Sequence, residues 1–238
     1  MKKLTQSTLL LAAIGWSLSA QAVPISFTKL TGLTGGSPAE TAVYQADLSS
    51  IVGITDLASI TIRDNSSGLG GATGQFSGFD LDAIILSNTD CATAGCAAGL
   101  TGLSLFDYTT SGTLFTPGTQ RAPTDPKLFG TDAGGTHVDN AVATLGAFDG
   151  NSTTLIPGAD GFISMGDDGI LSFNLTSLIS TSGLYLYIGE VGDNGEVANS
   201  SIEISDKPVV DVPEPATLAL LGLGLLGLGR SNRRRQNG

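Results

Sequence analysis

Basic residues are scarce in this chain once its two ends are set aside. Residues 23–212 contain five lysines and arginines against 21 acidic residues, which gives this part of the chain a net charge of −16. A surface of that sign repels phosphate backbones, so the composition argues against nucleic acid as a partner. It suits solubility, divalent cations or neutral polymers instead.

Histidine and tryptophan are each present once. A Ser-His-Asp triad would need His137, but no serine stands in a G-x-S-x-G pattern, and the glycine-rich surroundings of His137 are typical of a loop. We therefore expect no catalytic residues and no enzymatic activity. Trp16 lies near the N-terminus, so residues 23–212 lack the best platform for stacking on sugars, although tyrosines can substitute in part. These tyrosines are Tyr44, Tyr108, Tyr185 and Tyr187.

The N-terminus has the three parts of a secretory signal peptide. Lys2 and Lys3 give a positive start, residues 9–18 are almost entirely apolar, and Ala20 and Ala22 form a small-x-small cleavage site. We predict a signal peptide over residues 1–22, removed by signal peptidase, with Val23 first in the mature chain. The alternative is an uncleaved N-terminal membrane anchor.

The C-terminus has the features of a weak membrane tether. Residues 216–229 are uncharged and dominated by leucine and glycine, and as a helix they would span about 21 Å, against about 30 Å of hydrocarbon in a bilayer. The prolines that precede this segment stop the helix from extending backwards. Four arginines follow it and predict a cytoplasmic tail over residues 230–238, so that the rest of the chain faces outward. They are Arg230, Arg233, Arg234 and Arg235.

This C-terminal segment resembles the PEP-CTERM sorting signal. The string VPEPATLALLGLGLLGLGRSNRRR begins with Val212, Pro213, Glu214 and Pro215 and contains the motif, the short apolar helix and the basic tail in order. The resemblance implies recognition by an exosortase, a membrane-embedded transpeptidase-like enzyme. It also implies processing near the motif and routing to the cell surface or extracellular matrix. A permanent tail anchor is the alternative.

The region between the ends shows the pattern of an all-β domain. Short apolar or alternating runs are separated by Gly/Asp turns, of which Asp168-Gly169 and Asn194-Gly195 suit tight hairpins, and no helical period is sustained. We predict strands at 59–63, 79–86, 170–175, 184–188 and 201–204. We expect one β-sandwich or jelly-roll domain over residues 23–207 and a linker over 208–215. The stretches 77–84, 161–173 and 184–196 resemble strand-turn units of β-sandwich surface modules that have no assigned activity.

The two cysteines, Cys91 and Cys96, lie close together in the sequence. In an exported chain such a pair is typical of a small disulfide loop, and we predict that bond. A zinc site would need more nearby ligands than two cysteines and one histidine supply.

Acidic residues in the turns form a candidate calcium site. Calcium prefers clustered oxygen ligands, although no EF-hand spacing is present, and acids that only interact with water are the alternative. The candidate ligands are Asp160, Asp167, Asp168, Glu190, Asp193 and Asn194.

Three functions remain open from the sequence. The first is a non-enzymatic surface or matrix protein that associates with exopolysaccharide. The second is a calcium-dependent carbohydrate-binding or adhesive module. The third is a secreted hydrolase that uses two carboxylates, such as Asp80 and Asp82. A concave pocket that combines tyrosines with converging acids would favour the second or the third, and a flat acidic surface the first.

Overall fold

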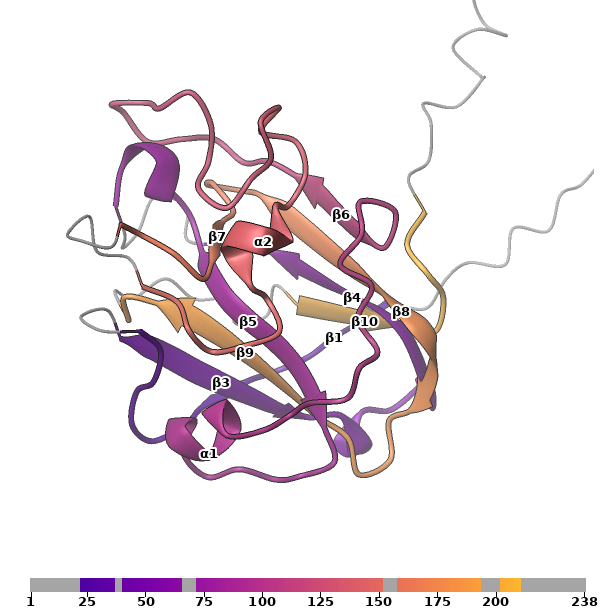
Figure 1. The fold of residues 1–238 in the computed structure, drawn as a ribbon. Helices are drawn as coiled ribbons and strands as arrows, with labels where there is room; N and C mark the ends of the chain where they lie inside the picture. The colour runs from indigo at the N-terminus through magenta and orange to yellow at the C-terminus, as the bar shows by residue number, and fades with distance from the viewer. Residues whose placement is uncertain (1–21, 37–39, 66–71, 152–157, 194–201, 211–238) are drawn as a thin grey trace, which may run out of the picture.

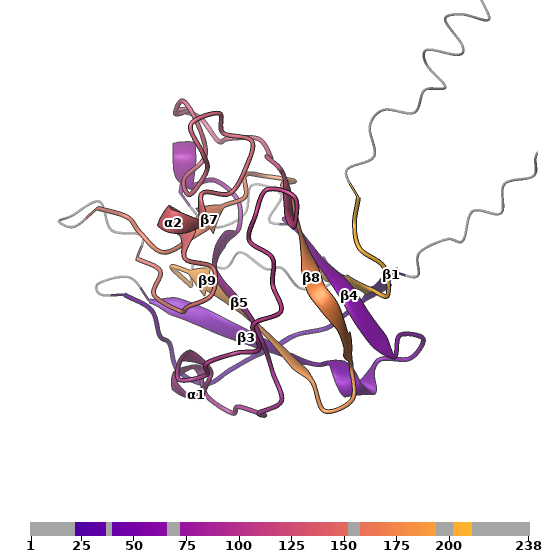
Figure 2. The same ribbon diagram turned by 45° about the vertical axis from the view of Figure 1, so that its right-hand side comes forward.

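The computed structural model describes residues 22–36, 40–65, 72–151, 158–193 and 202–210, and these residues form two five-stranded sheets (Figure 1). Sheet A has the strand order β1-β10-β4-β8-β6, and sheet B has the order β2-β3-β9-β5-β7. Every pairing between these strands is antiparallel. Figure 2 shows the two sheets as separate layers, with β4 and β8 in one and β3, β5 and β9 in the other. The arrangement is all-β and consistent with the predicted β-sandwich.

The strands of sheet A are β1 (Ala22–Pro24), β10 (Ile202–Ser205), β4 (Asp56–Arg63), β8 (Ile170–Ser180) and β6 (Thr113–Thr116). Those of sheet B are β2 (Thr28–Lys29), β3 (Thr41–Asp47), β9 (Tyr185–Val191), β5 (Asp80–Ser87) and β7 (Ile163–Ser164). The five predicted strands correspond to β4, β5, β8, β9 and β10, so their existence is confirmed. The other five strands, including the seven-residue β3, were not predicted.

The core lies between the two sheets. In sheet A the inward positions align across strands, since Ile60 pairs with both Ile204 and Phe173, and Ile62 pairs with both Ile202 and Leu171. Directly opposed residues share a face of the sheet, so these two rows form one apolar layer. Sheet B supplies the facing layer, with Leu81, Ile84, Leu86, Leu186 and Ile188 in the same buried cluster.

Helical structure in the described residues is limited to short pieces. These pieces are α1 (Ala94–Ala98), α2 (Asn140–Ala143) and the 3-10 turns η1 (Leu48–Ser50) and η2 (Gly74–Phe76). Each is no longer than about a turn and a half, which is too short to produce a 3.6-residue period in the sequence.

The predicted turn at Asp168-Gly169 is present, but it does not join a hairpin. Asp168 has a φ of +64°, the left-handed conformation that Asp tolerates better than most residues. The turn carries the chain from β7 of sheet B to β8 of sheet A. The buried Asp64 carboxylate secures it, because Oδ2 accepts a hydrogen bond from Asp168 N (3.0 Å) and Oδ1 accepts one from Phe79 N (2.9 Å).

Both ends of the described chain lie on sheet A. Strand β1 begins at Ala22, the last residue of the predicted signal peptide, and pairs with β10, the last strand. The segment that follows β10 also stays with this sheet (Figure 2).

Candidate functional site

The most informative site in the described structure is the segment that leads from the domain to the C-terminus. Residues 206–210, which we call the strap, cross the outer face of sheet A after β10 ends. Ser59 Oγ donates a hydrogen bond to Lys207 O (2.7 Å). Asn174 Nδ2 donates to Val209 O, and Val209 N donates to Asn174 Oδ1, each at 2.8 Å. Because Ser59 and Asn174 are paired neighbours in β4 and β8, the strap runs across the strands rather than along them.

The sheet presents polar side chains to the strap because residues alternate between its two faces. Ile60 and Ile62 point into the core, so Ser59, Thr61 and Arg63 point outward. On the same outer row Thr61 Oγ1 and Ser172 Oγ share a hydrogen bond of 2.9 Å. Arg63 and Glu203 form an exposed ion pair at 3.7 Å. The outer face of sheet A therefore presents mainly hydroxyl, amide and charged groups, with Ile170 and Leu114 on the same outward rows.

A groove lies beside the strap, with a volume of about 530 Å³. Sheet A forms its floor and the strap forms one wall. It is lined by Ala22, Thr61, Arg63, Leu114, Thr116, Ile170, Ser172, Glu203, Ser205, Lys207, Pro208, Val209 and Val210. Its lining holds one carboxylate and no tyrosine.

A second, smaller hollow of about 230 Å³ lies near β5 and contains Phe106 and Tyr108. Burial raises the pKa of Tyr108 to about 12, and its hydroxyl lies 3.3 Å from Leu145 O. No acid lines this hollow. Neither of the two hollows combines tyrosines with converging acids.

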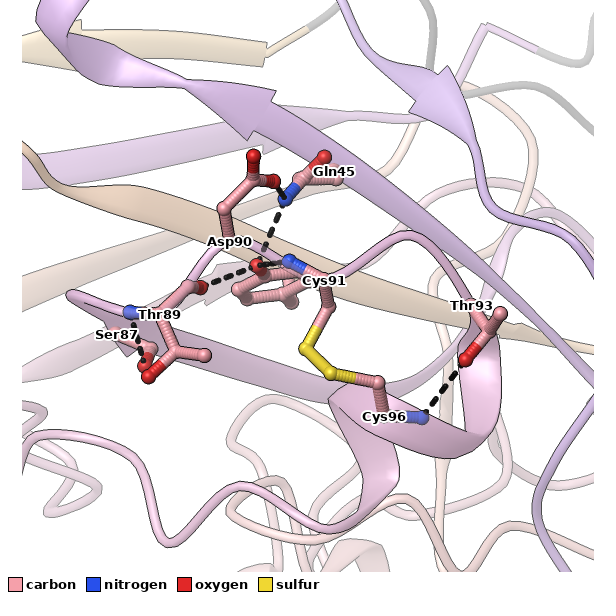
Figure 3. The surroundings of a disulfide bond; sticks show 8 residues. Gln45, Ser87, Thr89, Asp90, Cys91, Thr93 and Cys96 are labelled. Atoms are coloured by element: carbon pink, nitrogen blue, oxygen red, sulfur yellow. Dashed lines mark hydrogen bonds between the residues drawn. A yellow bond between two sulfur atoms is a disulfide. The ribbon is translucent and has the colours of Figure 1, made fainter.

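The predicted disulfide between Cys91 and Cys96 is present, and it fastens a loop over the outer face of sheet B (Figure 3). Tyr187 of β9 holds one end of this loop, since its hydroxyl donates to Thr89 O (2.6 Å) and accepts from Cys91 N (3.0 Å). At the other end Thr93 Oγ1 accepts from Cys96 N (3.2 Å) and caps α1. The outer face of sheet B is consequently covered, and Tyr187 is fully buried.

The candidate calcium ligands do not come together in the described structure. Arg121 Nε and Nη2 donate hydrogen bonds of 2.6–3.1 Å to the Asp167 carboxylate, and Lys29 forms an ion pair with Asp193. Asp168 lies in the turn before β8, and Glu190 is fully buried in β9. Asp160 exchanges backbone hydrogen bonds with Asn151, and Asn194 lies outside the described residues. Within the described ranges, no three His, Cys, Asp or Glu side chains gather where they could hold a metal ion.

The candidate carboxylate pair, Asp80 and Asp82, is buried in sheet B. Burial raises the pKa of Asp82 to about 7, although hydrogen bonds from Thr41 Oγ1 (2.6 Å), Gly150 N (2.9 Å) and Asp149 N (3.1 Å) work in the opposite direction. Gly150 has no room for a side chain, since a Cβ there would lie 2.8 Å from Asp82 Cγ. These contacts tie β5 to the neighbouring loop, and the burial keeps a polymeric substrate away from the carboxylate.

The pKa of Tyr44, a second titratable group of sheet B, is also shifted. Burial, with the negative charges of Glu190 and Asp193 adding to it, raises the pKa of Tyr44 to about 12. The Tyr44 phenol is therefore protonated at neutral pH, as an ordinary phenol is.

His137 lies in an exposed loop, as its sequence context predicted. Its Nδ1 lies 3.2 Å from Asp132 Oδ2 and 3.1 Å from Thr136 Oγ1. These side-chain partners belong to its own loop, and neither is a serine.

Several predictions fall outside the described residues. They are the signal peptide up to Gln21, the Pro-Glu-Pro motif, the helix at 216–229, the basic tail and the hairpin at Asn194-Gly195. In the part of the chain that the structure describes, no helix is long and apolar enough to cross a membrane.

Comparison with known proteins bears on the C-terminal end alone. No curated protein and no solved structure matches the chain. Residues 211–235 match the family model for the PEP-CTERM protein-sorting motif, and this match begins at the residue after the strap. The chain therefore carries a PEP-CTERM protein-sorting signal, which indicates an exported protein that is anchored in the membrane and then processed by an exosortase-type enzyme.

Proposed function

We propose that residues 23–207 form a non-enzymatic protein of the cell surface or extracellular matrix, structural or associated with exopolysaccharide, which reaches its place through the sorting signal. The match at residues 211–235 carries this proposal, because it assigns a route to the outside and no chemistry. The domain that travels this route is disulfide-bonded and acidic, as suits an exported protein.

The geometry of the acids supports a structural role for the domain. Asp80, Asp82 and Glu190 are buried in sheet B, and Asp167 and Asp193 are paired with cations. A two-carboxylate hydrolase needs acids that converge on an open cleft. The two hollows described above offer one carboxylate between them.

The position of the chain ends supports the predicted topology. Strand β1 begins at Ala22, the last residue of the predicted signal peptide, and pairs with β10, which precedes the sorting signal. Both targeting segments are thus attached to sheet A. In the predicted topology, the signal peptide (residues 1–22) and the tether (residues 216–229) insert into the same membrane, and residues 230–238 lie in the cytoplasm. Attachment of both segments to one sheet is compatible with this arrangement.

The sorting part of the proposal is tested on the termini of the protein. The full chain is expressed in a host with the processing enzyme, and the surface and extracellular fractions are analysed by mass spectrometry. We expect an N-terminus at Val23 and a C-terminus near Pro213, with residues 230–238 missing. Replacing Pro213, Glu214 and Pro215 by alanine should preserve membrane insertion and block release. Released protein that still carries residues 230–238 would refute the sorting proposal.

A carbohydrate-binding module is the second candidate, and the groove beside the strap favours it. The groove offers the hydroxyls of Thr61, Thr116 and Ser172 beside the guanidinium of Arg63. Purified exopolysaccharide from the host separates the candidates. A structural protein should co-sediment weakly and without saturation, and a binding module should bind saturably and lose binding in Arg63→Ala. Release of reducing ends from the polymer would contradict both candidates and favour the hydrolase.

A further inference from the structure

The strap places the sorting motif very close to the folded domain. Val209 is held through both its N–H and its C=O by the side chain of Asn174. Pro213 follows four residues later. Because an extended chain advances at most about 3.6 Å per residue, Pro213 lies within about 14 Å of Val209. With the strap docked, the domain would therefore sterically hinder an enzyme that binds at the motif.

We propose that the strap must leave sheet A before the sorting motif can enter the processing enzyme. The hydrogen bonds of Asn174 and Ser59 to the strap then slow processing. The proposal rests on exosortase-type processing at this motif. Extended peptides are bound largely through hydrogen bonds to their main chain, and the proposal takes the enzyme to bind the backbone on both sides of the bond that it cuts. For a cut near Pro213 the residues on the domain side include 209–212.

Docking and capture compete for the same atoms. Val209 N donates to Asn174 Oδ1 and Val209 O accepts from Asn174 Nδ2, so neither group is available to an enzyme while the strap is docked. Asn174 acts as a neighbouring strand would, with one donor and one acceptor on the same residue. Ser59 holds Lys207 O in addition, and Ser205 Oγ accepts from Lys207 N (3.1 Å).

The strap is suited to open without unfolding the domain. The hydrogen bonds described above are between neutral groups, whose net contributions are small, and ordering the strap costs conformational entropy. Val210 is 67% exposed, so opening can begin at the end nearest the motif. Segments of this kind open locally at much lower free energy than the core. The fraction of molecules with an open strap then scales the apparent rate of capture.

The test follows processing of the full chain by pulse-chase in a host with the enzyme. Asn174→Ala and Ser59→Ala should each speed processing, and the double variant should speed it roughly three- to tenfold as the open fraction rises. Asn174→Asp keeps the acceptor for Val209 N and loses the donor to Val209 O, so its rate should fall between the wild type and Asn174→Ala. Thr176→Ala, at an exposed position of β8 two residues from Asn174, is the matched control and should process at the wild-type rate.

Two further measurements separate strap opening from general destabilisation. In the purified full chain, hydrogen exchange at the Val209 amide should accelerate in Asn174→Ala and stay unchanged in Thr176→Ala. Inserting Gly-Ser-Gly-Ser after Val210 gives the enzyme residues that need no undocking. This insertion should speed processing of the wild type and remove most of the additional effect of Asn174→Ala.

Three outcomes overturn the proposal. The first is unchanged or slower processing in the double variant, and the second is unchanged exchange at Val209 in Asn174→Ala. The third is an effect of Asn174→Ala that persists in full after the insertion. Replacement of Pro213, Glu214 and Pro215 by alanine distinguishes these failures from failure of the sorting function. If that variant is processed like the wild type, the sorting proposal fails, and the strap proposal fails with it.

Discussion

The outer faces of the two sheets differ in what covers them. On sheet B, a disulfide-closed loop and α1 cover Val43, Ile85 and Tyr187, which form a second buried cluster. On sheet A, the outer face carries Ser59, Thr61 and Ser172, and the strap crosses it. The covered face stabilises the domain, whereas the polar face connects the domain to its sorting signal. Substitutions on sheet B should therefore affect stability, and those on sheet A the handling of the C-terminus.

The largest expected effect comes from Tyr187→Ala. The substitution removes a fully buried ring and three hydrogen bonds of its hydroxyl, to Thr89 O, Cys91 N and Gln45 Nε2. We expect a loss of about 3–5 kcal/mol in the free energy of unfolding, measured by urea denaturation. Thr176→Ala, at an exposed position of β8 in sheet A, is the control and should change stability by less than about 0.5 kcal/mol. Similar losses for the two variants would remove the distinction between the faces.

The next effect is the pH dependence that Asp82 contributes to sheet B. Its pKa is raised from 3.8 to about 7 in the folded chain, so the folded state binds more protons than the unfolded state between these values. The stability from this group is therefore present below about pH 4 and is lost as pH rises to about 7, by up to about 1.4 kcal/mol per pH unit.

Asp82→Asn is the matched variant for this prediction. The amide can still accept from the N–H groups of Asp149 and Gly150, and its NH₂ group can donate to Thr41 Oγ1, which then acts as acceptor. We expect the variant to unfold at higher urea than the wild type at pH 8 and to show a flatter stability profile between pH 4 and 7. A variant that follows the wild-type profile would show that Asp82 is not the source.

Reduction of the disulfide should have a smaller effect, confined to sheet B. The loop between Cys91 and Cys96 is short, and the chain-entropy treatment gives about 2 kcal/mol for its closure. We expect thiol labelling after unfolding to find no free thiols in the native protein, and mild reduction to lower stability by that amount. Hydrogen exchange at Val209 on sheet A should stay unchanged by reduction. Faster exchange there would mean that the two faces are coupled.

The strands that the sequence predicted show either alternation or a dense apolar run, and β5 is of the second kind, since it is buried at every position and contains Ile84, Ile85 and Leu86. Residues 59–63 alternate because β4 has one apolar face in the core and one polar face outside, and this alternation is visible in the sequence. Strand β3 is buried along most of its length, so it lacks the alternation of β4, and Ala42, Gln45 and Ala46 interrupt the apolar run that β5 shows. The four other unpredicted strands, β1, β2, β6 and β7, have two to four residues, too few for a pattern.

The candidate site was only partly predictable for a related reason. Asp160, Asp167 and Asp193 all lie in turns, and a sequence cannot show which turns meet. The structure pairs Asp167 with Arg121 and Asp193 with Lys29, both far away along the chain, and so separates the acids. Asn174 and Ser59 carry no sequence signal as partners of the strap, because their importance depends on the register between β4 and β8.

What the sequence by itself determined is local. The sorting signal, the five strands predicted from their apolar patterns and the disulfide all depend on residues near one another in the chain, and all are confirmed. The tertiary structure alone decided which acids are buried, which face of each sheet is covered, and that residues 206–210 return to sheet A. These features depend on strand register and on which loops meet, and both follow from packing the whole core rather than from any short segment.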